Sequence, residues 1–308
     1  MMKQWNGKPY YSLNAYLKNT YGEKMYKIAL DGGMTCPNRD GTLGTRGCIF
    51  CSRGGSGEFT PSRQLSVTEQ IEAAKHMVCK KQKSGSYIAY FQAFTNTYAP
   101  VDYLERIFME AILHPDVAIL SIATRPDCLS EDILALLSRL NQMKPVWIEL
   151  GLQTIHERSA EFIRRGYPLS VFEKALADLK ERSLSVITHV ILGLPHESAE
   201  DMLATVSYLS HSGIQGIKLQ LLHVLEGTDL ADYYRNGNFE VLTFAEYLEL
   251  LIDSLELLPP DMVIHRVTGD GPEKLLLAPL WSLEKWQVLN SILDEMNKRG
   301  SYQGRRFS

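Results

Sequence analysis

Three cysteines lie close together in the stretch TCPNRDGTLGTRGCIFCSRGGSG, residues 35–57. Cys36, Cys48 and Cys51 have the spacing C-x11-C-x2-C. Thiolates two residues apart can bind one centre, and the glycine-rich loop lets the third sulfur approach it. Structural zinc sites use four ligands, and no cysteine or histidine near this loop supplies a fourth. Three thiolates on a four-iron cluster instead leave one iron open, so the spacing favours such a cluster over zinc held with a distant ligand.

The elements that must position these thiols are predicted from apolar runs that alternate with amphipathic helical segments. Six runs rich in Val, Ile and Leu span residues 25–30, 87–91, 117–123, 146–150, 186–192 and 217–222. Such runs are typical of parallel strands covered on both faces. Between them, Ser66 with Glu69 and Ser198 with Asp201 have the spacing of helix capping boxes. The sequence therefore predicts an α/β fold whose parallel strands form an open or closed barrel.

Polar motifs follow these runs. The cysteine stretch follows the first, and the others are QAFTNT (92–97), ATRPD (123–127), GLQT (151–154), GLPHES (193–198) and HVLEGT (223–228). In a β/α barrel the loops after the strands share one rim, where active sites are built. We therefore expect these motifs to converge on one site.

Composition limits the classes of function. The chain has 308 residues, a net charge of −4 and five cysteines, an odd number that argues against a disulfide framework. The charge gives no general attraction to nucleic acid, so a polyanion needs a local basic patch. No apolar run is long enough to cross a bilayer, and the start lacks a signal-peptide core, which predicts a cytoplasmic protein without a membrane partner. Cys79 and Cys128 are expected to be buried thiols, although a reactive role for Cys128 stays open.

The order of strands and motifs over residues 21–234 resembles the radical S-adenosylmethionine (SAM) superfamily, on the branch of oxygen-independent coproporphyrinogen oxidase and the Elongator catalytic subunit. The first cysteine loop is longer than the usual C-x3-C-x2-C, as in Elongator-like members. The resemblance implies a partial (β/α)6 radical SAM barrel at residues 25–235. A basic and aromatic N-terminal extension (1–24) and a C-terminal extension (236–308) that packs on the core would flank it.

The resemblance also implies the cofactors. A [4Fe-4S] cluster would be bound by the three clustered cysteines, and its open iron would chelate SAM. One electron from a reducing partner such as flavodoxin or ferredoxin would then cleave SAM, while the protein supplies positioning and excludes water.

Residues that contact SAM are implied by position in the same resemblance. Thr95 lies in the segment whose backbone meets the SAM amino group. Gln153 and Arg165 match residues that hold the ribose and carboxylate, with Arg164 as a competing choice. His189 stands where relatives can carry an aspartate to the ribose, and Gly193, with Pro195, would shape the turn under the adenine.

Some residues of these motifs also have a purely structural interpretation. His189 on an apolar strand is typical of a hydrogen-bonded core histidine, and Gly193 can be a simple turn former. Arg125 and Asp127 of ATRPD are expected to form an ion pair across the rim.

The substrate is suggested by the chain ends and by the resemblance. Lysines alternate with aromatic residues before residue 28, and Arg305 and Arg306 lie in the tail, a combination that suits folded RNA as well as solvated chain ends. The segments TCPNRDG, ATRPDC, LLHVLEGT and HRVTGDGP resemble a small bacterial family close to the Elongator subunit, associated with the side chain of the tRNA wobble uridine.

The resemblance to that family implies an attack on an existing substituent, such as conversion of carboxymethylaminomethyl-uridine to aminomethyl-uridine, because the acetyltransferase domain of Elongator is not part of this sequence. Two alternatives stay open. One is a radical SAM enzyme acting on a small metabolite or porphyrin precursor, and the other is a non-catalytic iron–sulfur or zinc protein.

Overall fold

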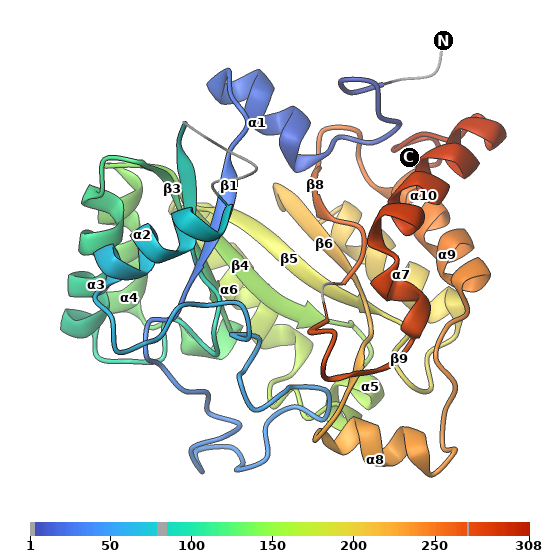
Figure 1. Cartoon of the computed structure of the whole chain (residues 1–308), viewed down its shortest axis with the longest axis horizontal. Coiled ribbons are helices and arrows are strands. Elements are labelled where there is room, and N and C mark those ends of the chain that lie inside the picture. Colours follow the sequence, from blue (N-terminus) through green and yellow to red (C-terminus); the bar gives the residue numbers. More distant parts are fainter. Residues whose placement is uncertain (1–3, 79–84, 270) are drawn as a thin grey trace.

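A parallel β-sheet, curved into a half-barrel, forms the centre of the computed structural model, which describes residues 4–78, 85–269 and 271–308 (Figure 1). The seven strands follow the order β1-β2-β3-β4-β5-β6-β8, and every neighbouring pair is parallel. Their bounds are β1 (Tyr26–Leu30), β2 (Tyr87–Phe91), β3 (Val117–Thr124), β4 (Val146–Gln153), β5 (Ser185–Leu192), β6 (Gly216–Leu221) and β8 (Val263–Arg266). The predicted α/β fold with a partial barrel is confirmed, and β8 adds a strand to the six that the sequence predicts.

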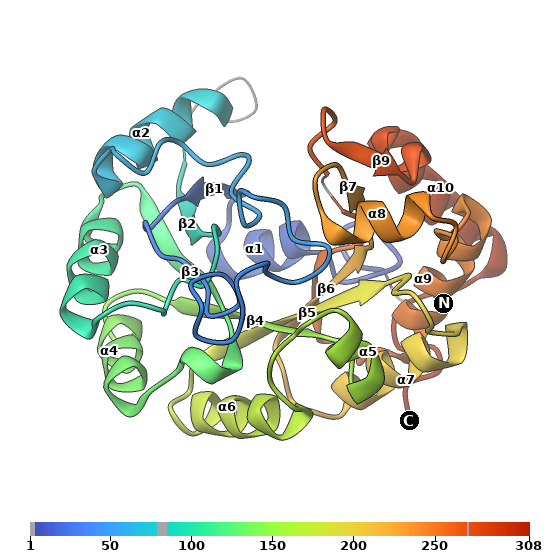
Figure 2. The ribbon, with the colours of Figure 1, turned by 90° about the horizontal axis from the view of Figure 1, so that it is seen from below.

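Helices cover the outer face of this sheet, as Figure 2 shows. They are α2 (Val67–Val78), α3 (Val101–Leu113), α4 (Glu131–Asn141), α6 (Leu169–Glu181), α7 (Ala199–Ser210) and α9 (Phe244–Leu257). Both predicted capping boxes are present, since Ser66 Oγ accepts from the Glu69 backbone N–H at 3.2 Å and Ser198 Oγ from that of Asp201 at 3.2 Å. Every residue of β2 is buried, as expected for a strand packed on both faces.

Shorter elements complete the chain. They are α1 (Leu13–Tyr21), the 3-10 turns η1 (Pro126–Cys128) and η2 (Leu280–Leu283), α5 (Glu157–Phe162), α8 (Asp229–Arg235), α10 (Lys285–Arg299), and the antiparallel pair β7 (Val224–Leu225) and β9 (Leu276–Ala278). Strand β8 lies within the segment predicted to pack on the core as a C-terminal extension, and it pairs directly with β6. Within the described residues, no helix has the length and apolar character needed to cross a membrane.

The two chain ends meet at the amino ends of the strands. Leu17 of α1 packs against Trp147 and Ile187, near the beginnings of β4 and β5. Gln303 of the tail joins this region, because its backbone N–H donates to Pro9 O at 2.9 Å and its Oε1 accepts from the Tyr11 N–H at 2.8 Å. In Figure 1 both ends lie at the top, whereas the cysteine loop lies below. The basic and aromatic ends therefore close the barrel on the side away from the cysteines.

Candidate active site

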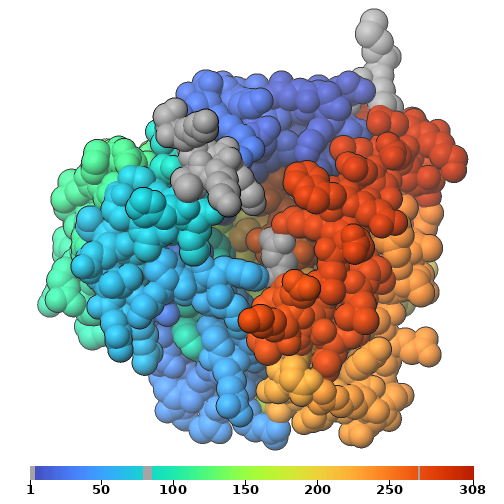
Figure 3. Space-filling model, in the orientation of Figure 1, coloured from blue at the N-terminus to red at the C-terminus, as the bar shows by residue number. Residues whose placement is uncertain are grey.

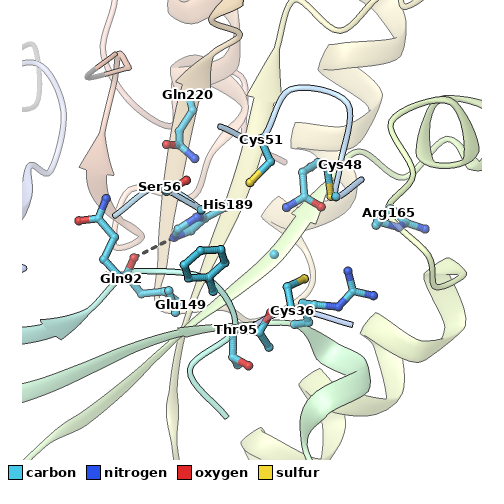
Figure 4. A pocket seen from close by; sticks show the side chains of 18 of the residues that line it. Cys36, Cys48, Cys51, Ser56, Gln92, Thr95, Glu149, Arg165, His189 and Gln220 are labelled. Carbon is cyan, nitrogen blue, oxygen red and sulfur yellow. Dashed lines mark hydrogen bonds and ion pairs between the residues drawn. The ribbon is translucent and has the colours of Figure 1, made fainter. Parts of the chain in front are cut away.

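The three clustered cysteines line one cavity at the carboxyl ends of the strands (Figure 4). A tight turn, in which Cys51 N donates to Cys48 O at 3.0 Å, brings two of them together. Arg39 holds this turn, since its Nη2 donates to Cys51 O at 3.0 Å. Asn38 Nδ2 donates to Arg164 O at 2.7 Å and contacts Cys48 Sγ at 3.4 Å, which fixes the loop to the end of α5. The loop is thus shaped by its own polar side chains.

A metal centre would relieve the electrostatic cost of these thiols. Burial, and then the nearby Cys51, raise the pKa of Cys48 to about 12. Burial also raises the pKa of Cys51, although the Arg39 guanidinium opposes the change. Thiolates buried in this way are favourable only beside compensating positive charge, which bound metal supplies as it displaces the protons.

The spread of the sulfurs fits a cluster better than a single ion. A tetrahedral zinc with Zn–S bonds near 2.3 Å holds its sulfurs roughly 3.8 Å apart. Among the described residues, the one group of three ligands whose atoms all lie within 4.8 Å is Glu72, His114 and Asp116, so the thiols are spread more widely. His189 lines the same cavity, but its Nε2 is bonded to Glu149 Oε2 at 2.8 Å and gives no fourth ligand. Three widely spaced thiols fit a [4Fe-4S] cluster with one open iron.

Of the two remaining cysteines, the structure describes Cys128. Cys128 is buried and its Sγ contacts Asp127 Oδ1 at 3.7 Å, while burial and then Asp127 raise its pKa to about 12. It lines a different cavity from the clustered thiols. This agrees with an ordinary buried thiol. Cys79 lies outside the described residues.

Four of the five residues predicted to contact SAM line the cysteine cavity: Thr95, Gln153, Arg165 and His189. The fifth, Gly193, does not. Its φ of +94° requires glycine, and a Cβ there would meet Leu242 Cδ1 at 3.2 Å. Gly193 thus turns the chain against the C-terminal part of the protein.

Thr95 lies after the end of β2 and Gln153 at the end of β4, and Gln153 has an unusual backbone conformation. Thr95 is 2% exposed, and its N–H already donates to Thr35 O at 3.2 Å. Gln153 is the last residue of β4, three residues beyond the predicted end of that strand, and has a φ of +67°. A left-handed conformation in a residue other than glycine costs about 1–3 kcal/mol and is common at functional sites. At Gly151 a Cβ would lie 2.8 Å from Gln153 Nε2, so glycine there leaves room for the amide.

Of the two adjacent arginines, only Arg165 lines the cavity. Its side chain is 1% exposed and holds the chain after β4, because Nη1 donates to Thr154 O at 2.6 Å and Nε to Tyr167 O at 2.9 Å. Its Nη2 contacts Glu157 at 3.2 Å. Arg164 instead pairs with Asp229 at 2.5 Å on the surface. The predicted ion pair at the rim is present, since Arg125 donates to both oxygens of Asp127 at 2.9 and 2.7 Å.

A buried charged cluster beneath the cysteines was not predicted from the sequence. Glu149 of β4 has a fully buried side chain that contacts Lys27 of β1, Lys218 of β6 and His189 of β5, and accepts from Ser121 Oγ at 2.7 Å. Burial and then Lys218 lower the pKa of His189 to about 4, although Glu149 opposes the change, so this histidine is neutral. A signal was present in the sequence, because three apolar runs each contain a charged residue. These residues are Lys27, Glu149 and Lys218.

Comparison with known proteins identifies this arrangement. The family description Radical SAM superfamily matches residues 41–209, and the Radical_SAM C-terminal domain matches residues 214–298. An uncharacterised protein, YtqA, of Bacillus subtilis is 45% identical over 300 residues, which cover 97% of this chain and 93% of that protein.

Two further matches are to proteins that are longer than the matched region. The tRNA uridine(34) acetyltransferase of Dehalococcoides mccartyi is 30% identical over 164 residues, which cover 52% of this chain and 35% of that protein. The solved structure of Methanocaldococcus infernus Elp3 has a TM-score of 0.68 at 18% identity, covering 91% of this chain and 64% of that one, and shows that the fold is shared. The chain belongs to the radical SAM superfamily, whose enzymes use a [4Fe-4S] cluster and S-adenosylmethionine.

Proposed function

We propose that this enzyme modifies the side chain of the wobble uridine of tRNA, for example by converting carboxymethylaminomethyl-uridine to aminomethyl-uridine. The partial relative from D. mccartyi is named for uridine 34, the wobble position, which supports this substrate. The observation that carries the proposal is the cavity itself, because the three thiols share it with amide and basic side chains, among them Gln92, Gln220 and Arg266. These groups suit a polar substituent.

The chain's own residues would position the cofactors. Cys36, Cys48 and Cys51 would bind the cluster, while Gln153 and the remaining N–H of Arg165 would hold SAM. When bound, this pair of cofactors would supply a radical that takes a hydrogen atom from the methylene carbon beside the carboxylate, and would take up one further electron. Hydrolysis of the resulting imine would release the two carbons of the carboxymethyl group as glyoxylate and leave aminomethyl-uridine. The half-barrel surrounds the reacting groups with buried strands, which excludes water.

A second cavity gives the substrate a route to this site. It lies between residues 50–59 and the C-terminal residues Arg266, Gly269, Gly271 and Pro272. The lining residues shared with the first cavity are Cys51, Ser56, Gln92, Gln220 and Arg266. Figure 3 shows a hollow on this face, between the blue loop and the red C-terminal segments. A flipped base could enter here, because enzymes that act on bases commonly extrude them from the stack.

The surface beside this entrance carries basic and aromatic groups. Arg53 and Arg63 are exposed on the segment between Cys51 and α2, and neither makes an ion pair within the part of the chain that the structure describes. Phe59, between them, is 48% exposed and lines the second cavity. Arginines bind phosphates and aromatic rings stack on unpaired bases. This loop is therefore better placed than the chain ends to bind an anticodon loop.

The tail arginines provide a matched control. Arg305 and Arg306 are exposed, but they pair with Glu256 and Asp253 at 3.4 and 2.8 Å on the opposite side of the barrel. Changing both Arg53 and Arg63 to Glu should weaken tRNA binding. The slope of the logarithm of the binding constant against the logarithm of the salt concentration should become shallower by about two. The same double reversal in the tail should leave binding unchanged in gel shifts at several salt concentrations.

Wobble nucleosides give the direct test. Mass spectrometry of tRNA from cells without the gene should show carboxymethylaminomethyl-uridine accumulating, and complementation should restore the downstream nucleoside. An unaltered nucleoside profile, together with absent tRNA affinity at low salt, would instead favour a small-metabolite substrate.

A further inference from the structure

Glu149 sits at the centre of the buried charged cluster with all of its acceptor positions in use. Oε1 accepts from Lys27 Nζ and Ser121 Oγ, and Oε2 accepts from Lys218 Nζ and His189 Nε2. A carboxylate offers about four such positions. Glu149 is therefore saturated, and its role is to hold the two lysines in place.

The two lysines differ in what else they can reach. Lys27 Nζ lies over the rings of Tyr90 and Trp147, 4.7 and 5.7 Å from their centroids, and Lys27 does not line the cysteine cavity. Lys218 does line it, with its side chain 5% exposed, and its Nζ contacts Tyr90 OH at 3.2 Å. An ammonium group has three N–H donors. With Glu149 and Tyr90 as partners, Lys218 retains one for a molecule in the cavity.

The buried cluster has more positive than negative groups, and a bound anion would balance the excess. Two ammonium groups face one carboxylate, and the neutral His189 adds nothing. Burial, opposed by Glu149 and assisted by Lys27 and Arg266, lowers the pKa of Lys218 to about 7. An unbalanced buried charge is unfavourable, and an anion beside Lys218 would restore its protonated form. Because Glu149 stands on the other side of the same ammonium group, a monoanion is favoured over a dianionic phosphate.

We propose that Lys218 binds a carboxylate group of the substrate inside the barrel, next to the space enclosed by the three cysteines. The site itself follows from the geometry, and its occupant rests on the proposed function: the carboxylate of the carboxymethylaminomethyl substituent. The product, aminomethyl-uridine, lacks this group. Lys218 is then a specificity-determining residue that distinguishes substrate from product.

The first experiment uses acetate as a probe and involves no tRNA. The anaerobic, cluster-containing protein is reductively methylated at near-neutral pH with acetate or with its neutral analogue acetamide, at matched ionic strength, and lysine labelling is followed by peptide mass spectrometry. With acetate at about twice its Kd, labelling of Lys218 should slow about threefold, whereas acetamide should have no effect. Lys144, which donates to His114 O and Val117 O outside the cavity, is the internal control.

The second experiment uses tRNA bearing carboxymethylaminomethyl-uridine. Lys218→Met should lower kcat/KM by about 10- to 100-fold, the loss expected for one charge-assisted hydrogen bond, mainly through KM. Lys218→Arg should recover part of the lost kcat/KM. The matched control is Lys75→Met, because Lys75 is also ion-paired, with Glu72 and Asp116, but lies on the outer surface. Wild-type enzyme should bind the substrate tRNA more tightly than tRNA with aminomethyl-uridine.

The two experiments fail in different ways. Equal labelling of Lys218 in acetate and acetamide would overturn the carboxylate site while leaving the tRNA proposal standing. Protection by acetate without any conversion of tRNA would support the site and contradict the tRNA proposal. A Lys218→Met enzyme with unchanged KM for the modified tRNA would also overturn the inference.

Discussion

Replacing Glu149 with glutamine removes the only carboxylate among the described residues that line the cysteine cavity. The amide keeps the size of the side chain but cannot balance Lys27 and Lys218, whose ammonium groups it would still face. Since the Glu149 side chain is fully buried, water cannot replace the lost charge. We therefore predict that replacing one carboxylate oxygen by an NH2 group causes a large loss of stability.

The magnitude follows from the burial of the pair. Removing one partner of a buried ion pair typically costs about 3–5 kcal/mol in the free energy of unfolding. For a chain of this size that corresponds to about 6–10 °C in Tm, at roughly 2 °C per kcal/mol. The matched control is Glu72→Gln, because Glu72 also contacts a lysine and a histidine but has 48% of its side chain exposed. Exposed pairs contribute about 0–1 kcal/mol.

The loss should depend on pH in a defined direction. Burial alone would raise the pKa of Glu149, but Lys218 and Lys27 hold it well below its ordinary value. Its contribution to stability is therefore present above the unfolded pKa and is lost only as the pH falls through the lowered folded value. In the variant, Lys218 loses the neighbour that raises its pKa and sheds its proton more readily. The destabilisation should be larger near pH 6 than near pH 8.

The assay is urea unfolding of the reduced, cluster-free protein under nitrogen, followed by tryptophan fluorescence and circular dichroism. The cluster is omitted because its loss would make the transition irreversible. A Glu149→Gln protein within about 1 kcal/mol of the wild type near pH 6, or one no less stable than Glu72→Gln, would refute this explanation of the buried cluster.

Further predictions concern the cofactor residues. Alanine at any one of the three clustered cysteines should abolish the uptake of about four irons per chain on anaerobic reconstitution, whereas Cys128→Ala should retain it, as counted by iron and sulfide analysis. Gln153→Ala should raise the Kd for SAM about 10-fold with the cluster intact, measured by equilibrium dialysis. Arg165→Ala should weaken SAM binding and also lower stability by about 2–4 kcal/mol in urea unfolding, because it leaves buried carbonyl groups without donors.

Six of the seven strands could be predicted because each lies in a mainly apolar run. The run at residues 87–91 coincides with β2, and those at 117–123 and 186–192 differ from β3 and β5 by one residue each. Strand β8 was missed because it has only four residues and ends in His265 and Arg266. The three-residue extension of β4 was missed because Gly151 was interpreted as the end of the strand.

The cysteine loop could be predicted from its spacing, but the charged cluster and the chain ends could not. Lys27, Glu149 and Lys218 are far apart in sequence and meet only because the sheet curves. The basic ends were interpreted from composition, which does not say which end of the barrel they cover. The chain ends pack at the amino ends of the strands because of their apolar residues, such as Leu17.

The most direct test of the proposed function combines both cofactors and the proposed substrate. Reduced, cluster-containing enzyme is incubated anaerobically with SAM and tRNA bearing carboxymethylaminomethyl-uridine, and 5′-deoxyadenosine and wobble nucleosides are quantified from the same reaction. We predict that 5′-deoxyadenosine and aminomethyl-uridine increase together, and that neither forms in the Cys48→Ala protein. Formation of 5′-deoxyadenosine while the wobble nucleoside stays unchanged would contradict the proposed substrate, and the absence of 5′-deoxyadenosine from fully loaded enzyme would contradict the assigned cofactor site.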